Sequence, residues 1–232
     1  MIGWLIYSAV DVEKNKYYIQ MYKDKFKEHF IEIKLVIVEE LENMEQYVKC
    51  NKVDFAINRS RNHIMGELLE QKGVRVFNSS SVTRIANNKG ITYEFLKDVV
   101  PFLAVKYGNE IIESKIENKG FEYPYVIKSC SGHGGSQVFL VNNRKEEEQA
   151  VKAMNGQEYV VQQCCSDLGR DVRAYIIGNK IIKAVLRTST ESFKSNYSLG
   201  GKVQEYTLNN EEKAMVERIV DKLPLDYAGI DF

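Results

Sequence analysis

The sequence contains few of the residues that mark a disulfide-rich or zinc-binding protein. It has four cysteines and three histidines among 232 residues. Cys164 and Cys165 are adjacent, no two cysteines have the Cys-x-x-Cys spacing, and no pair of histidines lies near them. This pattern argues against a zinc site and against a disulfide framework. We expect the cysteines to be reduced, small apolar side chains in a cytoplasmic protein.

Long apolar runs and an excess of either charge are also absent. No stretch approaches the roughly 20 apolar residues of a membrane-spanning helix, and residues 1–16 lack the basic start and the small-residue cleavage site of a signal peptide. Lysine plus arginine equals aspartate plus glutamate, at 32 each. We therefore expect neither a membrane nor a nucleic acid as a partner. This balance of charges is compatible with a small local cluster of cations that binds a phosphate.

The apolar content, 44% of the residues, is that of a packed globular protein. Over residues 1–86, short β-branched runs alternate with charged amphipathic segments. The expected strands are Trp4–Tyr7, Ile33–Val38, Val53–Ile57 and Val74–Phe77, and the expected helices are Lys16–Phe30, Leu41–Cys50 and His63–Lys72. Strands that alternate with helices predict a parallel sheet covered on both faces, in a Rossmann-like domain.

Polar residues follow several of these expected strands. They are Ser8, Asn58, Arg59 and Asn78. Ligands of open parallel sheets bind beyond the carboxyl ends of the strands, which makes this rim a candidate site. The alternative is that these residues only form turns and helix caps.

The remainder of the chain divides into two predicted regions, 87–158 and 159–232. In the first, a helix ending near Gly120 is expected, and two strands, YPYVIKS and SQVFLV, enclose a glycine-rich loop. In the second, Gly178-Asn179 between two apolar runs predicts a two-residue β-hairpin. The last expected strand is YAGIDF at the end of the chain.

The loop SCSGHGGS, Ser129 to Ser136, is the first candidate for chemistry. Its glycines allow backbone N–H groups to approach an anion closely, but the loop matches neither GxGxxG nor the P-loop. Lys128 precedes it at the end of an apolar strand, and Lys89 lies at an expected helix start. Two lysines and this loop would neutralise a triphosphate. The alternatives are a glycine hairpin without a ligand and two lysines that extend into solvent.

Two further motifs stand near the C-terminus, FKSNYSLGG (Phe193 to Gly201) and AGIDF (Ala228 to Phe232). Together with VIKSCSGHGGSQV, and in this order along the chain, they resemble the ATP-grasp superfamily and within it the RimK-like carboxylate–amine ligases. The resemblance implies an α/β fold, α+β in the ATP-binding part. A Rossmann-like domain (1–86) would precede the small lid subdomain with the glycine loop (87–158) and the C-terminal ATP-grasp subdomain (159–232).

The resemblance also implies roles for individual residues. Contacts to the nucleotide phosphates would come from Lys89, Lys128, Gly132, His133, Gly134, Gly135, Ser136 and Lys194. The adenine would lie against Gln162, Gln163, Cys164 and Cys165, and the ribose against Asp171. Catalytic contacts to the transferred phosphoryl group or the substrate would come from Arg173, Arg187 and Asn196, and Asp231 would bind the metal.

The sequence departs from the family's pattern at four residues in three places. Lys194 replaces the usual arginine of F-R-[SA]-N, which keeps the charge but loses the bidentate geometry. Gln137 stands where a glycine is common, and Gln163-Cys164 replaces an acidic-aromatic pair. Side-chain contacts to adenine are therefore in question, whereas backbone contacts would persist.

The activity that the resemblance implies is ATP-dependent joining of a carboxylate, such as that of glutamate, to an amine of a peptide, protein or amino acid. The cofactors would be ATP and Mg²⁺, with Mn²⁺ as an alternative metal. Self-association is left open.

In the family, a Glu-x-Asn pair on the next strand completes the metal site, and these 232 residues stop one residue after Asp231. We therefore expect a fold truncated at its C-terminal end that binds nucleotide but ligates poorly or not at all by itself. The competing interpretation is a non-catalytic, nucleotide-binding relic with a regulatory role.

Overall fold

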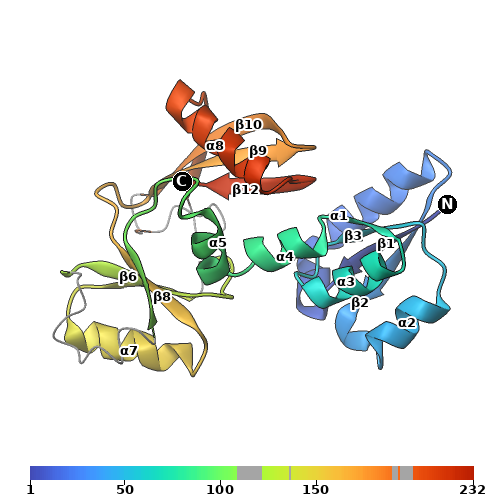
Figure 1. Cartoon of the computed structure of the whole chain (residues 1–232), viewed down its shortest axis with the longest axis horizontal. Coiled ribbons are helices and arrows are strands. Elements are labelled where there is room, and N and C mark those ends of the chain that lie inside the picture. The colour runs from blue at the N-terminus through green and yellow to red at the C-terminus, as the bar shows by residue number, and fades with distance from the viewer. Residues whose placement is uncertain (109–121, 136, 190–192, 194–200) are drawn as a thin grey trace. The chain divides into compact units, whose positions relative to one another are not determined.

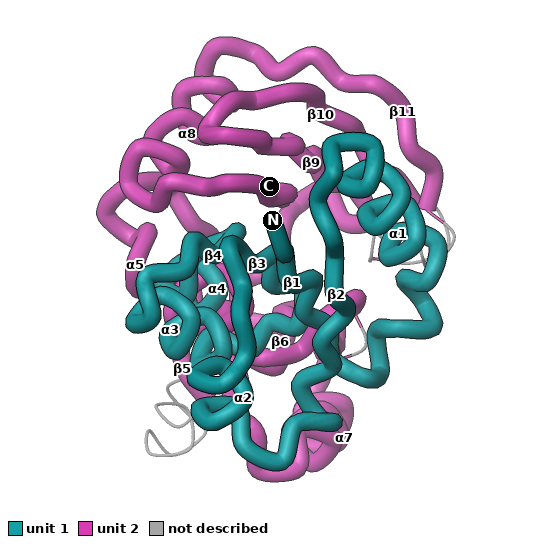
Figure 2. Tube along the Cα trace, turned by 90° about the vertical axis from the view of Figure 1, so that its right-hand side faces the viewer, with its two compact units in different colours: residues 1–84 teal, residues 85–232 magenta. Residues whose placement is uncertain are grey.

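The computed structural model describes residues 1–108, 122–135, 137–189, 193 and 201–232. The chain forms two compact units, unit 1 (Met1–Arg84) and unit 2 (Ile85–Phe232), which are coloured separately in Figure 2. The expected helix before Gly120 lies outside the described residues, as do Ser136, Lys194 and Asn196 of the predicted site.

Unit 1 is built on a four-stranded parallel sheet (Figure 1). Its strands are β1 (Ile2–Tyr7), β2 (Glu32–Ile37), β3 (Phe55–Asn58) and β4 (Arg75–Phe77), in the order β2-β1-β3-β4. The register places Ile6 opposite Val36 of β2 and Asn58 of β3. The four strands predicted from the apolar runs are confirmed.

At least one helix follows each of these strands, as the alternating pattern predicts. The helices are α1 (Ala9–Lys27), the short η1 (Val38–Glu40), α2 (Met44–Cys50), α3 (His63–Gln71) and α4 (Ser80–Ala86). Asn43 and Asn62 cap α2 and α3 through their side chains, which satisfies backbone N–H groups that the helix leaves unpaired. Gly73 follows α3 with φ +78°, the left-handed conformation that glycine commonly adopts just after a helix.

The first sheet of unit 2 is antiparallel and carries the glycine-rich loop. Its strands are β5 (Val105–Tyr107), β6 (Tyr125–Ser129), β7 (Val138–Val141) and β8 (Tyr159–Gln163), in the order β5-β8-β6-β7. The helix α5 (Lys89–Leu96) precedes the sheet in the chain. α7 (Arg144–Met154) covers one face, where Ala150 and Met154 pack against Tyr125 and Ile127. Val126 and Lys128 lie on the opposite face of β6, because side chains alternate along a strand.

The second sheet of unit 2 is formed by β9 (Arg170–Ile177), β10 (Lys180–Thr188), β11 (Lys202–Tyr206) and β12 (Tyr227–Asp231), in the order β11-β10-β9-β12. The predicted hairpin joins β9 to β10, and both turn residues, Gly178 and Asn179, have positive φ, at 54° and 63°. A two-residue hairpin turn of this type requires that conformation. Helix α8 (Asn210–Lys222) begins at a capping box between Asn209 and Glu212.

The fold is therefore mixed α/β, with one parallel and two antiparallel sheets, as the sequence predicts. Strand β8 hydrogen-bonds to β5 and β6, so it belongs to the sheet of the residues that precede it. The division at residues 158 and 159 stays a prediction. Within the described ranges, no helix combines the length and apolarity needed to cross a membrane.

Candidate functional site

The two predicted phosphate-binding lysines lie on different elements of unit 2 and reach the same region. Lys89 is the first residue of α5, whose cap is the Asn88 side chain accepting a hydrogen bond from Ile91 N at 3.1 Å. Lys128 extends from the face of β6 that α7 does not cover. The charge of Lys89 lowers the pKa of Lys128, so the structure brings these two ammonium groups near each other.

Both lysines bind neutral oxygens. The Lys89 ammonium donates to the carbonyl oxygen of Gly132 at 2.5 Å, and that of Lys128 donates to the side-chain oxygen of Gln162. Burial lowers the pKa of Lys128, and the positive charge of Lys89 lowers it further; burial also lowers that of Lys89. Neither lysine forms an ion pair with a residue that the structure describes. Two neighbouring cations without a carboxylate partner would be stabilised by a bound anion.

The glycine-rich loop starts directly beside these cations. The backbone N–H of Lys89 donates to the Cys130 carbonyl at 2.9 Å, which joins the start of α5 to the loop. Gly134 and Gly135 have positive φ, at 64° and 79°, a conformation that costs glycine little and that exposes N–H groups for an anion. His133 is exposed on the same loop.

Gln137, which departs from the family's pattern, helps to hold the base of this loop. Its carbonyl accepts from Ser129 N at 3.1 Å, and its side-chain nitrogen donates to Gln157 Oε1 at 2.9 Å. The same oxygen of Gln157 accepts from the Ser129 hydroxyl at 3.3 Å. The glutamine therefore supplies a brace that a glycine at this position could not.

The predicted adenine-binding segment, residues 162–165, lies at the end of β8, the strand that pairs with β6. Gln162 is buried and faces Lys128, whereas Gln163 is exposed and its backbone N–H donates to the Ala104 carbonyl at 3.0 Å. Burial raises the pKa of the Cys164 thiol, and the Lys128 charge opposes that rise, which places Cys164 near the lysine. Cys165 is exposed. The structure thus brings together Lys128, Gln162 and Cys164. The side chains of Gln163 and Cys165 are exposed instead.

Tyr93 belongs to the same region and was missed from the sequence. Burial raises the pKa of its hydroxyl to about 12, and a hydrogen bond with Gln162 opposes the rise. Tyr93 lies one helical turn after Lys89, on the same face of α5. That spacing of four residues is the sequence signal that could have identified it.

Two predicted catalytic residues, Arg173 and Arg187, form a second cluster on β9, β10 and β12 with Asp171, predicted to contact ribose, and Asp231, predicted to bind the metal. Arg187 donates from Nε and Nη2 to the two carboxylate oxygens of Asp171, both at 2.6 Å. Arg173 makes the same bidentate contact with Asp231, at 2.5 and 2.6 Å. Arg187 Nη2 also lies 3.1 Å from Asp231 Oδ1, so four charged side chains form one network. Such planar, paired contacts are the strongest that arginine makes.

Register explains why these four residues share a face. Arg187 lies opposite Asp171, and Asp231 lies opposite Arg173. Gly229, two residues before Asp231, lies under Arg173: a Cβ there would be 3.1 Å from Arg173 Nε. The glycine of the AGID motif therefore leaves room for the guanidinium, which would have to shift by a few tenths of an ångström if this residue had a side chain.

The described residues do not by themselves form a magnesium site. Mg²⁺ needs several oxygen ligands in octahedral geometry, and both oxygens of Asp231 are bonded to guanidinium groups. Over the described ranges, no three histidine, cysteine, aspartate or glutamate side chains group together to hold a metal. The metal-binding role of Asp231 stays a prediction, as does the contact of Asp171 with ribose.

Comparison with known proteins agrees with the motifs. Residues 86–232 match the family model described as a RimK-like ATP-grasp domain. The chain is 30% identical over 231 residues to the "Uncharacterized protein MG011 homolog" of Mycoplasma pneumoniae, covering 98% of this chain and 77% of that one. It is 26% identical over 167 residues to a "Probable alpha-L-glutamate ligase" of Haemophilus ducreyi, which is 69% of this chain and 54%, about half, of the ligase.

Among solved structures, a RimK domain ATP-grasp protein from Sphaerobacter thermophilus superposes with a TM-score of 0.73 at 20% identity. The match covers 100% of this chain and 85% of that protein. At this level of identity the likeness establishes the fold.

Proposed function

The chain belongs to the RimK-like ATP-grasp family, and on that premise we propose that it is an ATP-dependent ligase that joins the carboxylate of an amino acid such as glutamate to an amine. Relatives named alpha-L-glutamate ligase support the choice of glutamate. The reaction would pass through an acyl phosphate and form ADP and phosphate.

The observation that carries this proposal is the pair formed by Lys89 and Lys128. Two partly buried ammonium groups, each with a lowered pKa and neither in an ion pair among the described residues, need an anion of high charge nearby. The glycine loop beside them offers backbone N–H groups. Charge neutralisation and positioning are what phosphoryl transfer requires of a protein.

In the proposed reaction, a carboxylate oxygen of the substrate attacks the γ-phosphorus of ATP, and ADP leaves with the electron pair of the broken P–O bond. The amine nitrogen then attacks the acyl carbon, phosphate leaves, and the nitrogen loses a proton. Arg173 and Arg187 would stabilise the transferred phosphoryl group by exchanging part of their contacts with Asp231 and Asp171 for its oxygens, which the guanidinium geometry matches. Gln162, Gln163, Cys164, Cys165 and Asp171 would hold the nucleoside.

The test is formation of ADP by protein expressed from the complete reading frame. ATP, magnesium and L-glutamate would be supplied with a panel of amino-acid and peptide amines. We expect ADP release that requires both glutamate and an amine, together with glutamate-dependent exchange of ¹⁸O between bridging and non-bridging positions of ATP, the mark of a reversible acyl phosphate.

Two results would count against the ligase. ADP release at the same rate with and without a carboxylate substrate would indicate a nucleotide hydrolase. Nucleotide binding without any ADP formation would favour the non-catalytic, nucleotide-binding protein.

A further inference from the structure

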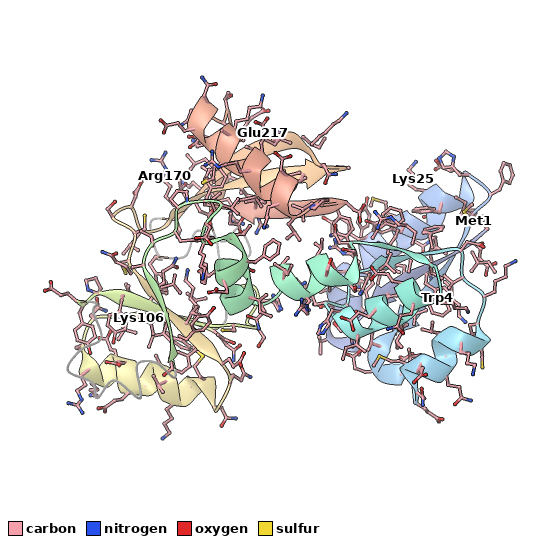
Figure 3. All side chains as sticks on the ribbon, in the orientation of Figure 1. Met1, Trp4, Lys25, Lys106, Arg170 and Glu217 are labelled. Carbon is pink, nitrogen blue, oxygen red and sulfur yellow. The ribbon has the colours of Figure 1, made fainter. Side chains whose placement is uncertain are left out.

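The side chain of Gln162 contacts Lys128, one of the two lysines assigned to the nucleotide phosphates. Gln162 lies on β8 opposite Val126 of β6, and Lys128 follows Val126 by two residues. Residues two apart share a face of a strand, so Lys128 and Gln162 are diagonal neighbours on one face of the sheet, a separation that long side chains can span. Figure 1 labels both strands, and Figure 3 adds the side chains of the described residues.

The polar groups of Gln162 are already used inside unit 2. A lysine ammonium can only donate hydrogen bonds, so the amide oxygen of Gln162 is the atom that faces Lys128. The Tyr93 hydroxyl on α5 hydrogen-bonds to the same side chain. Strands β5 and β6 flank the residue, with Val105 and Val126 opposite it, so its backbone groups take part in the sheet. The amide oxygen is therefore not available to the amino group of adenine.

The partner that β8 offers to Lys128 is neutral. Gln162 is 9% exposed, so water screens its contact with the ammonium group only weakly. A carboxylate at this position would form an ion pair with Lys128 and compete with an anionic ligand for its charge. An aliphatic side chain would leave the ammonium without this acceptor. An amide directs the ammonium and leaves its positive charge to the ligand.

We propose that Gln162 is a positioning residue for nucleotide binding: its neutral amide oxygen holds the ammonium of Lys128 in place for a phosphate group and does not neutralise it. The inference rests on the proposed function for the identity of the ligand. In this account Gln162 touches no phosphate, so its effect on the affinity for ADP passes through Lys128.

Calorimetric titration of ADP into the full chain tests this role. Gln162→Met, similar in size but without the amide oxygen, should weaken ADP binding by about two- to tenfold, as for loss of a neutral hydrogen bond. Gln162→Glu should weaken it about tenfold or more, because the new carboxylate neutralises Lys128. Gln149→Glu, which adds the same charge on the exposed side of α7, should bind ADP as wild type does.

A double-mutant cycle shows whether the effect passes through Lys128. Lys128→Met combined with Gln162→Met should bind ADP as weakly as Lys128→Met alone. If Gln162→Met weakens binding by the same factor with and without Lys128, Gln162 contacts the nucleotide itself, and the proposal is wrong. Equal ADP affinity in wild type, Gln162→Met and Gln162→Glu, or no ADP binding at all, would also overturn it.

The pH dependence of ADP binding separates positioning from a merely structural role. Burial and the Lys89 charge hold the pKa of Lys128 below 10.5. In wild type the affinity should fall as the pH rises through this lowered value, because only the ammonium form attracts a phosphate. In Gln162→Glu the fall should occur at higher pH, since a nearby carboxylate favours the ammonium form. An unchanged midpoint would show that the side chain at position 162 does not act on Lys128.

Other titratable groups lie around this pair. They are Lys89 and Tyr93 on α5, Cys130 after β6 and Cys164 after β8. These groups are common to wild type and Gln162→Glu, so the difference between the two pH profiles reports the change at position 162. Thermal unfolding shows which variants are folded. If Gln162→Met does not fold, Gln162→Glu and its pH profile still decide the outcome.

Failure of this role and failure of the ligase function look different. ADP release that requires glutamate and an amine, with the same KM for ATP in wild type and Gln162→Met, would disprove the positioning role and leave the ligase intact. ADP binding that depends on Gln162 only when Lys128 is present, in a protein that forms no ADP from ATP, would establish the role without the ligase.

Discussion

Lys128 occupies a position that is unfavourable for a cation in the absence of a ligand. Burial and the nearby Lys89 both lower its pKa below the ordinary value of 10.5. Among the described residues, its ammonium group donates to the neutral side-chain oxygen of Gln162. The buried charge of Lys128 therefore lowers the free energy of unfolding of the ligand-free protein, as charged groups at binding sites commonly do.

We therefore expect Lys128→Met to raise the free energy of unfolding of the ligand-free protein by about 0.5–2 kcal/mol at neutral pH. A lowered pKa means that the unfolded chain binds the proton more tightly than the folded one, so the cost of the charge is present below the folded-state pKa. It should disappear as the pH rises through that value towards 10.5.

Urea unfolding at neutral and alkaline pH measures this difference. Lys152→Met on the exposed side of α7 is the matched control and should shift stability little at either pH. If Lys128→Met were less stable than wild type at neutral pH, the charge of Lys128 would be stabilised by the protein itself without a ligand, contrary to this account.

Arg187 is the reverse case, a buried cation that is paired with two carboxylates. It is 5% exposed and bonds to Asp171 and Asp231. Arg187→Met would remove the bidentate contact to Asp171 and one contact to Asp231 from a buried position, and we expect a loss of about 2–4 kcal/mol in the free energy of unfolding.

The control is Arg170→Met, because Arg170 contacts Asp167 at 3.4 Å on an exposed surface. Its loss should cost under about 0.5 kcal/mol. If the two variants unfold at the same urea concentration, the network of Arg173, Arg187, Asp171 and Asp231 does not hold the second sheet of unit 2 together.

At the scale of single elements, the β9–β10 hairpin shows what the sequence could and could not predict. The turn at Gly178-Asn179 was predictable because few residues tolerate positive φ at two successive positions. The side-chain pairs across the hairpin were not. A regular two-residue hairpin would place Leu186 opposite Asp171, but the register shifts between Ile181 and Lys183.

That β-bulge changes the chemistry of the face. A shift of one residue moves every later side chain of the strand to the other side of the sheet. Arg187 lies opposite Asp171 only because of it. The arginine and the aspartate were predicted as site residues from the motifs, but their ion pair depends on a bulge that has no clear sequence signal.

The glycine-rich loop yields a prediction for an element. Residues 130–135 carry three glycines and have no large apolar side chain to anchor them, so their amide hydrogens should exchange readily in the free protein. Bound ADP would order the loop through contacts to its N–H groups. Hydrogen exchange followed by mass spectrometry should show slower exchange in this peptide with ADP than without it.

The hairpin turn at residues 178 and 179 is the internal control for this experiment, since it is remote in sequence from every residue assigned to the nucleotide phosphates. Its exchange should not change with ADP. Exchange in the glycine loop that is equally slow in both states would contradict the assignment of this loop to the phosphates.

For the whole molecule, the composition predicted a fold that needs neither disulfides nor zinc. All four cysteines are free thiols: Cys130 is buried, Cys164 half-buried, and Cys50 and Cys165 are exposed. The melting temperature should therefore be the same with and without reductant, and with and without a zinc chelator. A sharp shift with either additive would disprove this expectation.

The apolar pattern predicted the strands of both units well because strand burial follows directly from alternation and run length. It could not predict that β8 joins the sheet of β5, β6 and β7, since strand order depends on contacts between distant segments. The motifs located Lys89 and Lys128, and the structure brings the two together. Tyr93 was missed because nothing but its spacing from Lys89 distinguishes it from a core aromatic.

The central claim is that Lys89 and Lys128 hold the phosphates of ATP, and calorimetric titration of ADP tests it most directly. Wild type and Lys152→Met should bind ADP alike. Lys128→Met should bind it at least about tenfold more weakly, since loss of a charge-assisted hydrogen bond costs about 1.5–3 kcal/mol. Equal ADP affinity in wild type and Lys128→Met would contradict the claim.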